Sequence, residues 1–226
     1  MRVLFVTHGP SVPGGVFEHE VEERGHTLAR WSVPDGGTPG RDYDAVMVFG
    51  GAAHPDQDDH FHWLAHEAEF LRNVLAERVP VFGVCLGAQM LARAAGARVG
   101  PAREAEIGWY DVELTPAGGR DPVLGAMAPS ATVFQWHRYT YEIPAGGVEL
   151  ARSPAATQAF HLPPSAWGIQ FHAEVTLEML AAWIEEDPDD LPRPAETVLD
   201  ESRQRIPASN ALGRAVCSAF LDAAAR

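Results

Sequence analysis

Lysine is absent from the sequence, and all 17 of its basic residues are arginines. Without lysine, the chain can neither form a Schiff base with a substrate nor supply the lysine of a phosphate-binding P-loop. Long apolar runs are also missing near the start, where MRVLFVTHG reaches a polar turn after four apolar residues in a row. That run is too short for a secretion signal or a membrane span. We therefore expect a cytoplasmic protein with no membrane partner.

Cysteine and positive charge are both scarce. The two cysteines, Cys85 and Cys217, lie far apart in the sequence and form neither a disulfide framework nor a zinc knuckle. In a reducing compartment both are expected to be free thiols. The 17 basic residues face 31 acidic ones, and the formal charge of −14 repels phosphate backbones. No run of arginines forms a basic stripe, so we expect no nucleic-acid partner.

The first half of the chain alternates strand and helix signals. With 226 residues the chain can bury one sizeable core, which suits a single domain. Strands are predicted at 2–9, 44–51 and 79–84, with a weaker one at 27–33. Helices are predicted at 16–25, 88–96 and 55–79, the last opening with acidic residues suited to a helix N-terminus. This alternation is typical of a doubly wound α/β protein with a parallel sheet.

The second half changes character. Short β runs separated by proline and glycine are predicted at 107–115, 132–136, 148–153, 157–162 and 167–172, and they favour an antiparallel extension of the sheet. A helix is predicted at 174–186, a proline-interrupted linker at 187–196 and a terminal helix at 211–226. The expected fold is α/β, with a mostly parallel, flavodoxin-like three-layer sheet. Residues 1–190 form the main domain, and 191–226 are a linker and a helix packed on it.

Cys85 lies in the stretch Gly83-Val84-Cys85-Leu86-Gly87, at a predicted strand-to-helix junction. Most free cysteines in such domains are small buried hydrophobic residues. The context here is instead the G-x-nucleophile-x-G elbow, in which a sharp turn presents the reactive side chain above the sheet. The thiol would then lie at a helix N-terminus, where free N–H groups favour negative charge. Cys85 is therefore the candidate nucleophile.

A base and an orienting acid follow in AWGIQFHAEV, residues 166–175. His172 ends an apolar strand, and Glu174 follows two positions later on the same face of an extended chain. The carboxylate can reach the imidazole and fix its tautomer, as a nucleophile's base requires. In an α/β-hydrolase the acid precedes the histidine, so this order points to a different family.

Three motifs together resemble the class I, triad-type glutamine amidotransferases: FGVCLGAQ, the distal FHAEV and the upstream VFGGAAH. They occur in the family's order, and EIGWYDVELT and QWHRYTYEIP are further matches. The likeness covers roughly residues 1–185 and is greatest to stand-alone, GMP-synthase-like members, which include γ-glutamyl peptidases. It implies that residues 1–190 form a catalytic domain of this type.

The resemblance also implies a reaction. Cys85 would attack the γ-carboxamide of glutamine or of a γ-glutamyl compound, giving a thioester and releasing ammonia or an amine. His172 would act as base and then acid, oriented by Glu174. The backbone N–H groups of Gly51 and Leu86 would form the oxyanion hole.

Five further residues are implied to bind substrate: Gly50, Gln89, His137, Arg138 and Tyr139. Gln89 matches a family residue that faces the glutamyl group, and His137 matches a loop that holds the α-amino and carboxylate ends. GMP-synthase domains usually read His-Gly-Asp in this loop, whereas this chain reads His-Arg-Tyr. The arginine and the aromatic ring favour a longer or anionic substituent over free glutamine. No cofactor is implied.

A second departure from the family is Ala173, which stands where the family usually has proline. The residues after 190 contain no P-loop and no pyrophosphatase signature, so any synthetase partner is expected to be a separate subunit. The alternative is a non-catalytic binding module on the same fold, with Cys85 as a redox sensor. Relatives of that kind often have histidine after the elbow cysteine, and Leu86 argues against that branch. A degenerate scaffold conflicts with the complete triad.

Four histidines near the start of the predicted second helix suggest a metal site, since positions 62 and 66 are one turn apart. No cysteine lies nearby, and a solvated, histidine-rich helix end is favoured for His54, His60, His62 and His66. Cys217 has helical spacing but no elbow and no nearby base, so it is predicted to be a packing residue.

Overall fold

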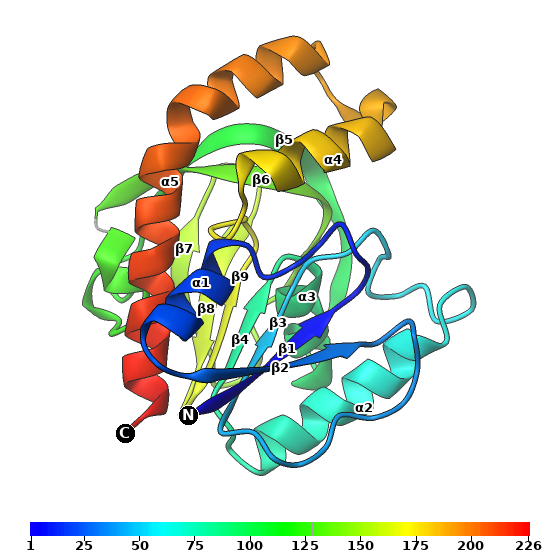
Figure 1. The fold of residues 1–226 in the computed structure, drawn as a ribbon, viewed down its shortest axis with the longest axis vertical. Coiled ribbons are helices and arrows are strands. Elements are labelled where there is room, and N and C mark those ends of the chain that lie inside the picture. Colours follow the sequence, from blue (N-terminus) through cyan, green and yellow to red (C-terminus); the bar gives the residue numbers. More distant parts are fainter. Residues whose placement is uncertain (128) are drawn as a thin grey trace.

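The computed structural model describes residues 1–127 and 129–226. In these residues nine strands form one sheet in the order β2-β1-β3-β4-β9-β8-β7-β5-β6 (Figure 1). The strands are β1 (Arg2–Thr7), β2 (Thr27–Ser32), β3 (Ala45–Val48), β4 (Val81–Val84), β5 (Val99–Leu114), β6 (Ser130–Tyr141), β7 (Val148–Arg152), β8 (Thr157–Leu162) and β9 (Ala166–Ile169).

The parallel half of the sheet contains β2, β1, β3, β4 and β9. Its strands follow the flavodoxin order of a doubly wound fold. Strands β3, β4 and β9 are buried along their whole length because helices cover both faces of the sheet. The helices are α1 (Val16–Glu23), α2 (Trp63–Ala76), α3 (Leu86–Ala94), α4 (Leu177–Glu186) and α5 (Ala195–Ala224).

Two apolar layers sandwich the parallel strands. On one face, Phe17 of α1 and Phe220 of α5 pack against Phe82 of β4, with ring centroids 5.9 and 5.4 Å from that of Phe82. On the other face, Leu64 of α2 and Leu91 of α3 join a second buried cluster. This three-layer arrangement fixes the carboxyl ends of the parallel strands, where sites of doubly wound proteins lie.

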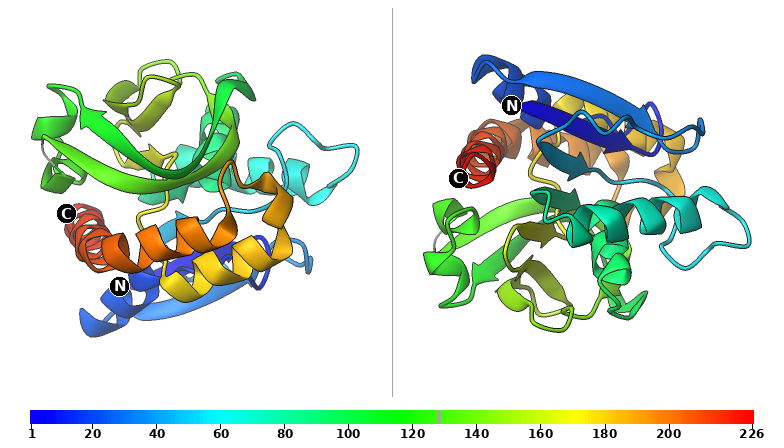
Figure 2. Two further views of the ribbon diagram at one scale, coloured as in Figure 1. Left: turned by 90° about the horizontal axis from the view of Figure 1, so that it is seen from above. Right: turned by 90° about the horizontal axis from the view of Figure 1, so that it is seen from below.

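The antiparallel half, β8, β7, β5 and β6, curls away from the parallel half, as the two views of Figure 2 show. Its last strand returns to the chain just after β9, where Phe134 pairs with His172 in an isolated bridge. The predicted α/β fold with an antiparallel extension is confirmed, and this extension adds four strands to the five of the parallel half. Its curl brings β6 over the end of β4.

The second helix was predicted to begin near residue 55, but α2 begins at Trp63. A turn occupies the preceding segment, because the side chain of Gln57 accepts a hydrogen bond from the His54 amide at 2.9 Å. The Gln57 amide in turn donates to the His54 carbonyl. Such local side-chain bonds compete with helix formation. The acidic residues at 56–59 therefore belong to a turn instead of a helix.

The last helix is much longer than predicted, since α5 begins at Ala195 instead of residue 211. Pro207 lies inside it, on the exposed face, where water can reach the Arg203 carbonyl that the proline leaves without a donor. Figure 1 shows the resulting bend between the upper and lower parts of α5. No helix in the described part of the chain is long and apolar enough to cross a membrane.

Candidate active site

The predicted elbow is present between β4 and α3. Cys85 is the N-cap of α3 and has a φ of 53° and a ψ of −112°, a conformation that non-glycine residues rarely adopt. A Cβ added at Gly83 would lie 2.7 Å from the backbone of Gly87 and Ala88. One added at Gly87 would lie 2.2 Å from the carbonyl oxygen of Val48. Both glycines are therefore required, because strand, turn and helix meet backbone to backbone.

The buried pair of His172 and Glu174 follows β9. Nδ1 of His172 lies 2.7 Å from Oε1 of Glu174, and the two residues are 3% and 1% exposed. A carboxylate only accepts hydrogen bonds, so Nδ1 carries the proton and Nε2 is left for other chemistry. This is the tautomer that a nucleophile's base needs.

The electrostatics of His172 favour its charged form. Burial lowers the pKa of the imidazole, but the charge of Glu174 and the hydrogen bonds to Cys85 and Glu174 outweigh it and raise the pKa to about 10. The imidazole is thus protonated at neutral pH. Cys85 itself is 6% exposed, with Sγ 3.8 Å from the Trp136 carbonyl oxygen of β6.

Three elements hold the segment from His172 to Glu174. The His172 amide donates to the Phe134 carbonyl of β6 at 2.8 Å. The Glu174 carbonyl accepts from Val16 at the start of α1 at 2.9 Å. A Cβ added at Gly213 of α5 would lie 1.9 Å from the carbonyl oxygen between them, that of residue 173. The segment is therefore clamped from β6, α1 and α5.

The predicted oxyanion donors, Gly51 and Leu86, line the same hollow as Cys85. Neither backbone amide has a hydrogen-bond partner in the described part of the chain. Leu86 is the first residue of α3, where N–H groups are free and the helix dipole is positive. Gly50 lies against the reacting groups, because a Cβ there would be 3.1 Å from His172 Cε1 and 3.7 Å from Cys85 Cβ.

Sequence reasoning missed a second buried imidazole. His8 follows β1, with Nδ1 2.9 Å from the Gly50 carbonyl oxygen and Nε2 3.0 Å from Oε2 of Glu67. Both side chains are almost fully buried. Burial lowers the pKa of His8, but the Glu67 charge and its hydrogen bonds raise it above its ordinary value. The sequence feature that could have indicated His8 is its position at the carboxyl end of a predicted parallel strand, the edge of the sheet where such sites form.

Two of the predicted substrate-binding side chains are held by bonds within the protein. Gln89 of α3 donates through Nε2 to the Tyr139 carbonyl at 2.9 Å and to Oε1 of Gln170 at 3.1 Å. Nδ1 of His137 lies 3.0 Å from the Tyr139 carbonyl oxygen, and Nε2 lies 3.1 Å from Oε2 of Glu106. Both ring nitrogens of His137 are therefore engaged.

The residues from His137 to Tyr139 were predicted to be a loop, but they lie inside β6. Pairing with β5 continues through His137, and it resumes at Tyr139 beyond a bulge. Arg138 donates to Oδ1 of Asp190 at 2.7 Å, and this bond lowers the Asp190 pKa. Its charge is therefore already paired. The Tyr139 ring stacks on His54 at 4.0 Å.

Two hollows meet at Cys85. The Gln89 hollow, of about 110 Å³, extends over Gln89 and Tyr139. The Trp183 hollow, of about 130 Å³, extends over Val12, His172 and Trp183. Gly51, Ala52, Cys85, Trp136 and Asp187 line both. The nucleophile thus lies where two separate spaces join.

Of the four histidines and Cys217, His54 lines the Gln89 hollow and the others line neither hollow. Among the described residues, no three histidine, cysteine or acidic side chains gather as metal ligands. His66 packs its ring against Trp31, whereas His54 faces Tyr139. Cys217 is buried in α5 against the Phe17 carbonyl, and burial raises its pKa far above the ordinary value. Its predicted packing role is confirmed.

The fold and the site place the chain among α/β proteins that present a nucleophile on a strand-to-helix elbow. The family model of class I glutamine amidotransferases matches residues 17–186. The chain belongs to this family, and the resemblance read from its motifs is confirmed.

Similar proteins include an amidotransferase-like protein, a γ-glutamyl amide hydrolase and a GMP synthase subunit. The glutamine amidotransferase-like protein YfeJ of Salmonella typhimurium is 32% identical over 84% of this chain and 83% of its own length. The γ-glutamyl-L-1-hydroxyisopropylamide hydrolase of a Pseudomonas species is 30% identical over 59% of this chain and 48% of its own length. A glutamine-hydrolysing GMP synthase subunit from Haloarcula marismortui is 34% identical over 64% of this chain and 72% of its own length.

A solved structure agrees with the fold. The crystal structure of a glutamine amidotransferase from Thermotoga maritima superimposes with a TM-score of 0.89 at 26% identity. The match covers 98% of both chains, so it includes α5 as well as the parallel and antiparallel halves of the sheet.

Proposed function

We propose that the protein hydrolyses the γ-amide of glutamine or of a γ-glutamyl compound through a γ-glutamyl thioester on Cys85. The observation that carries this proposal is the 2.7 Å bond between His172 and Glu174, beside a cysteine on an elbow. A protonated His172 next to Cys85 is the arrangement that an activated thiol needs.

In the first half-reaction the Cys85 sulfur attacks the γ-carbonyl carbon and a C–S bond forms. The carbonyl electron pair moves onto oxygen, where the Gly51 and Leu86 amides donate to it. The tetrahedral intermediate then collapses and the C–N bond breaks. His172 gives its Nε2 proton to the departing nitrogen, which leaves as ammonia or an amine.

In the second half-reaction the neutral His172 takes a proton from water, and the water oxygen attacks the thioester carbon. The C–S bond breaks and glutamate leaves. Cys85 is again a thiolate beside a protonated imidazole, which Glu174 has held in one orientation throughout.

The glutamyl part of the substrate is assigned to the Gln89 hollow. Gly50 supplies an unhindered approach beside Cys85, since it has no side chain facing the reacting groups. Gln89 and Tyr139 line the hollow, and His137 braces it through its bonds to neighbouring residues. Arg138 also lines it, but with its charge paired to Asp190.

The chain's domain organisation and compartment remain predictions. We propose that residues 1–190 carry the machinery and that 191–226 brace it, which the contact of Gly213 with the triad segment supports. A cytoplasmic setting is supported by two free thiols, Cys85 and Cys217.

A second candidate is an ammonia-producing subunit that works with a separate synthetase. It is favoured by the likeness to the GMP synthase subunit of Haloarcula marismortui, which includes most of that protein's length. The likeness to a γ-glutamyl amide hydrolase favours independent hydrolysis instead. The assay that separates them compares the isolated chain on glutamine and on γ-glutamyl amides.

The test of the proposed function is release of ammonia or amine by the wild type, Cys85→Ala and His172→Ala. Loss of release in both variants, with normal release by the matched control Cys217→Ala, supports the proposal. Release that persists in Cys85→Ala contradicts it. If the wild type releases nothing from glutamine or from γ-glutamyl amides and Cys85 is reversibly oxidised, the redox-sensing alternative is supported.

A further inference from the structure

The Trp183 hollow has a place in the reaction that follows from the position of the proton donor. The nitrogen that leaves must receive its proton from His172. His172 lines the Trp183 hollow but not the Gln89 hollow. The two substituents of an amide point in different directions from its carbonyl carbon. With the glutamyl chain in the Gln89 hollow, the amine substituent extends into the Trp183 hollow.

The size of the Trp183 hollow exceeds what ammonia needs. Its volume is about 130 Å³. A water molecule, which is about as large as ammonia, takes roughly 30 Å³ in the liquid. On the measure used for this volume one water needs only about 10–15 Å³, so the hollow has room for a leaving group that carries a short carbon chain.

One wall of the hollow is apolar and well fixed. Trp183 of α4 donates its indole N–H to the Ser11 carbonyl at 2.6 Å, and its ring lies edge-on to His172 with centroids 4.8 Å apart. Trp136 of β6 closes another side, with its ring centroid 6.1 Å from that of Trp183. Val12 in the loop after β1 completes this wall. An alkyl chain would bury its surface against these groups.

The charges around the hollow exclude an anionic leaving group. Glu186 and Asp187 line it, and neither carboxylate forms an ion pair in the described part of the chain. No arginine lines it. Its two imidazoles, His8 and His172, are each bonded to a buried carboxylate. A carboxylate on the leaving group would therefore face two like charges, while the imidazoles are already paired with carboxylates of the protein.

We propose that the Trp183 hollow is an amine subsite, and that the preferred substrates are γ-glutamyl alkylamides with a neutral or cationic amine. γ-Glutamyl amino acids and peptides, whose leaving group bears a carboxylate, are disfavoured. This inference rests on the proposed function and names its substrate class. It replaces the prediction from sequence that Arg138 favours an anionic substituent, because that arginine is paired with Asp190.

The test uses four probes with the wild-type protein: glutamine, γ-glutamyl-n-butylamide, γ-glutamyl-(3-aminopropyl)amide and γ-glutamyl-β-alanine. The last three have leaving groups of matched length and different charge. We expect kcat/KM for the two alkylamides to exceed that for the β-alanine conjugate and for glutamine by at least about ten-fold, since discrimination is a ratio of these constants.

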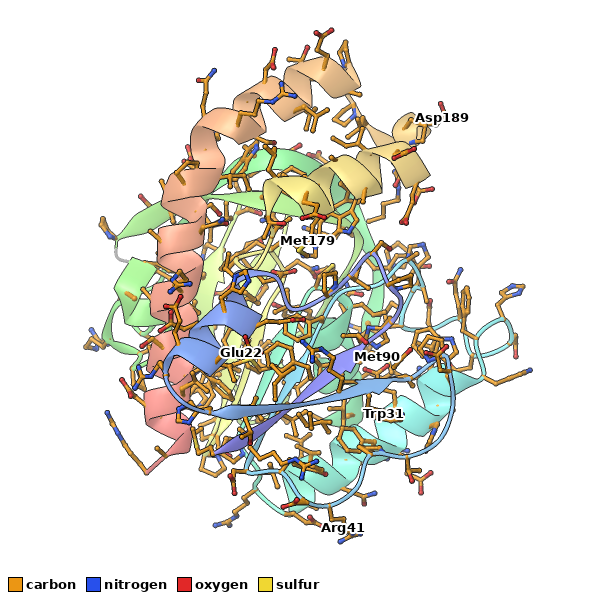
Figure 3. The ribbon with its side chains drawn as sticks, viewed as in Figure 1. Glu22, Trp31, Arg41, Met90, Met179 and Asp189 are labelled. Carbon is orange, nitrogen blue, oxygen red and sulfur yellow. The ribbon has the colours of Figure 1, made fainter. Side chains whose placement is uncertain are left out.

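Two variants locate the effect. Val12→Phe narrows the hollow and lowers kcat/KM for the butylamide about ten-fold more than for glutamine. The double variant Glu186→Gln/Asp187→Asn raises kcat/KM for the β-alanine conjugate relative to kcat/KM for the butylamide by about three- to ten-fold. The matched control is Asp189→Asn, an acidic residue that does not line the hollow and lies at the outer edge of the molecule (Figure 3). It leaves the ratio unchanged.

The outcomes separate the two proposals. Hydrolysis of all four probes at similar kcat/KM, a preference for the β-alanine conjugate, or an equal loss on all probes in Val12→Phe overturns the amine subsite alone. The absence of release from every probe by the wild type overturns the proposed function and the subsite together.

Discussion

Nδ1 of His8 lies 2.9 Å from the carbonyl oxygen of Gly50. A carbonyl only accepts, so the imidazole donates this bond, and Glu67 holds the other ring nitrogen. In a trans peptide the carbonyl of one residue and the N–H of the next point in opposite directions. The bond to Gly50 therefore fixes the direction of the Gly51 N–H, which is the proposed oxyanion donor.

This relationship predicts a kinetic effect of His8→Leu. Removing one oxyanion donor outright costs about 10²- to 10³-fold in kcat. His8→Leu loosens the donor instead of removing it, so we expect kcat to fall by about 10- to 100-fold with KM nearly unchanged. Glu67→Gln, which keeps the shape, should give a smaller fall. Steady-state kinetics measure this, with the exposed His60→Leu as the control, and a raised KM at unchanged kcat would contradict the assignment.

The raised pKa of His172 predicts the alkaline limit of activity. Its proton, needed by the leaving group, is lost as the pH rises through about 10. Glu174→Gln removes a charge that raises this pKa, so the alkaline limb of kcat/KM should move to lower pH. Profiles of kcat/KM against pH for both proteins test this. An unmoved limb would show that Glu174 does not set the protonation of the base.

The same pKa predicts how stability depends on pH. The folded protein holds the His172 proton up to about pH 10, whereas an unfolded histidine loses it near its model value of 6.5. This contribution to the free energy of unfolding is fully present below the unfolded value and is lost as the pH rises through the folded one. Denaturant unfolding between these pH values should show falling stability, with a shallower fall in Glu174→Gln.

Gly213→Ala should disturb the triad from a distance. The new Cβ would lie 1.9 Å from the carbonyl oxygen of Ala173, between His172 and Glu174. We expect a loss of about 1–3 kcal/mol in the free energy of unfolding, as for other overpacked sites, together with a lower kcat. Gly119→Ala is the matched control because its Cβ would meet open space. Similar behaviour of the two variants would contradict the clamp.

The two cysteines should react very differently with a glutamine-like electrophile. Cys85 lies in a hollow beside a protonated imidazole, whereas Cys217 is 1% exposed and its pKa is raised by burial. Brief treatment followed by peptide mass mapping should find the label on Cys85. Predominant labelling of Cys217 would refute the assignment of the nucleophile.

The sequence predicted the parts of this site whose chemistry is local. The glycines on both sides of Cys85 indicate an elbow, because close contacts between backbone segments leave no room for a Cβ at these positions. His172 and Glu174 are only two residues apart in the sequence, so their contact could be predicted without knowledge of the fold. The buried parallel strands were equally readable from their continuous apolar runs.

Contacts between distant segments were not readable in this way. The pairing of His8 with Glu67 joins a strand end to the middle of a helix, and nothing in either segment alone predicts it. Arg138 was interpreted as a charge available to the substrate, because its partner, Asp190, lies in a segment predicted to be a linker. The helix predicted at 211–226 begins much earlier, at Ala195, because the exposed position of Pro207 lets α5 continue through it.

Trapping the γ-glutamyl thioester that we propose on Cys85 is the sharpest test of the reaction. The protein is mixed with γ-glutamyl-n-butylamide, quenched in acid during turnover, and mapped by peptide mass spectrometry. We expect a γ-glutamyl adduct on the Cys85 peptide that builds up within the first turnover and is absent from Cys85→Ala. Turnover by Cys85→Ala, or an adduct on Cys217 in its place, would contradict it.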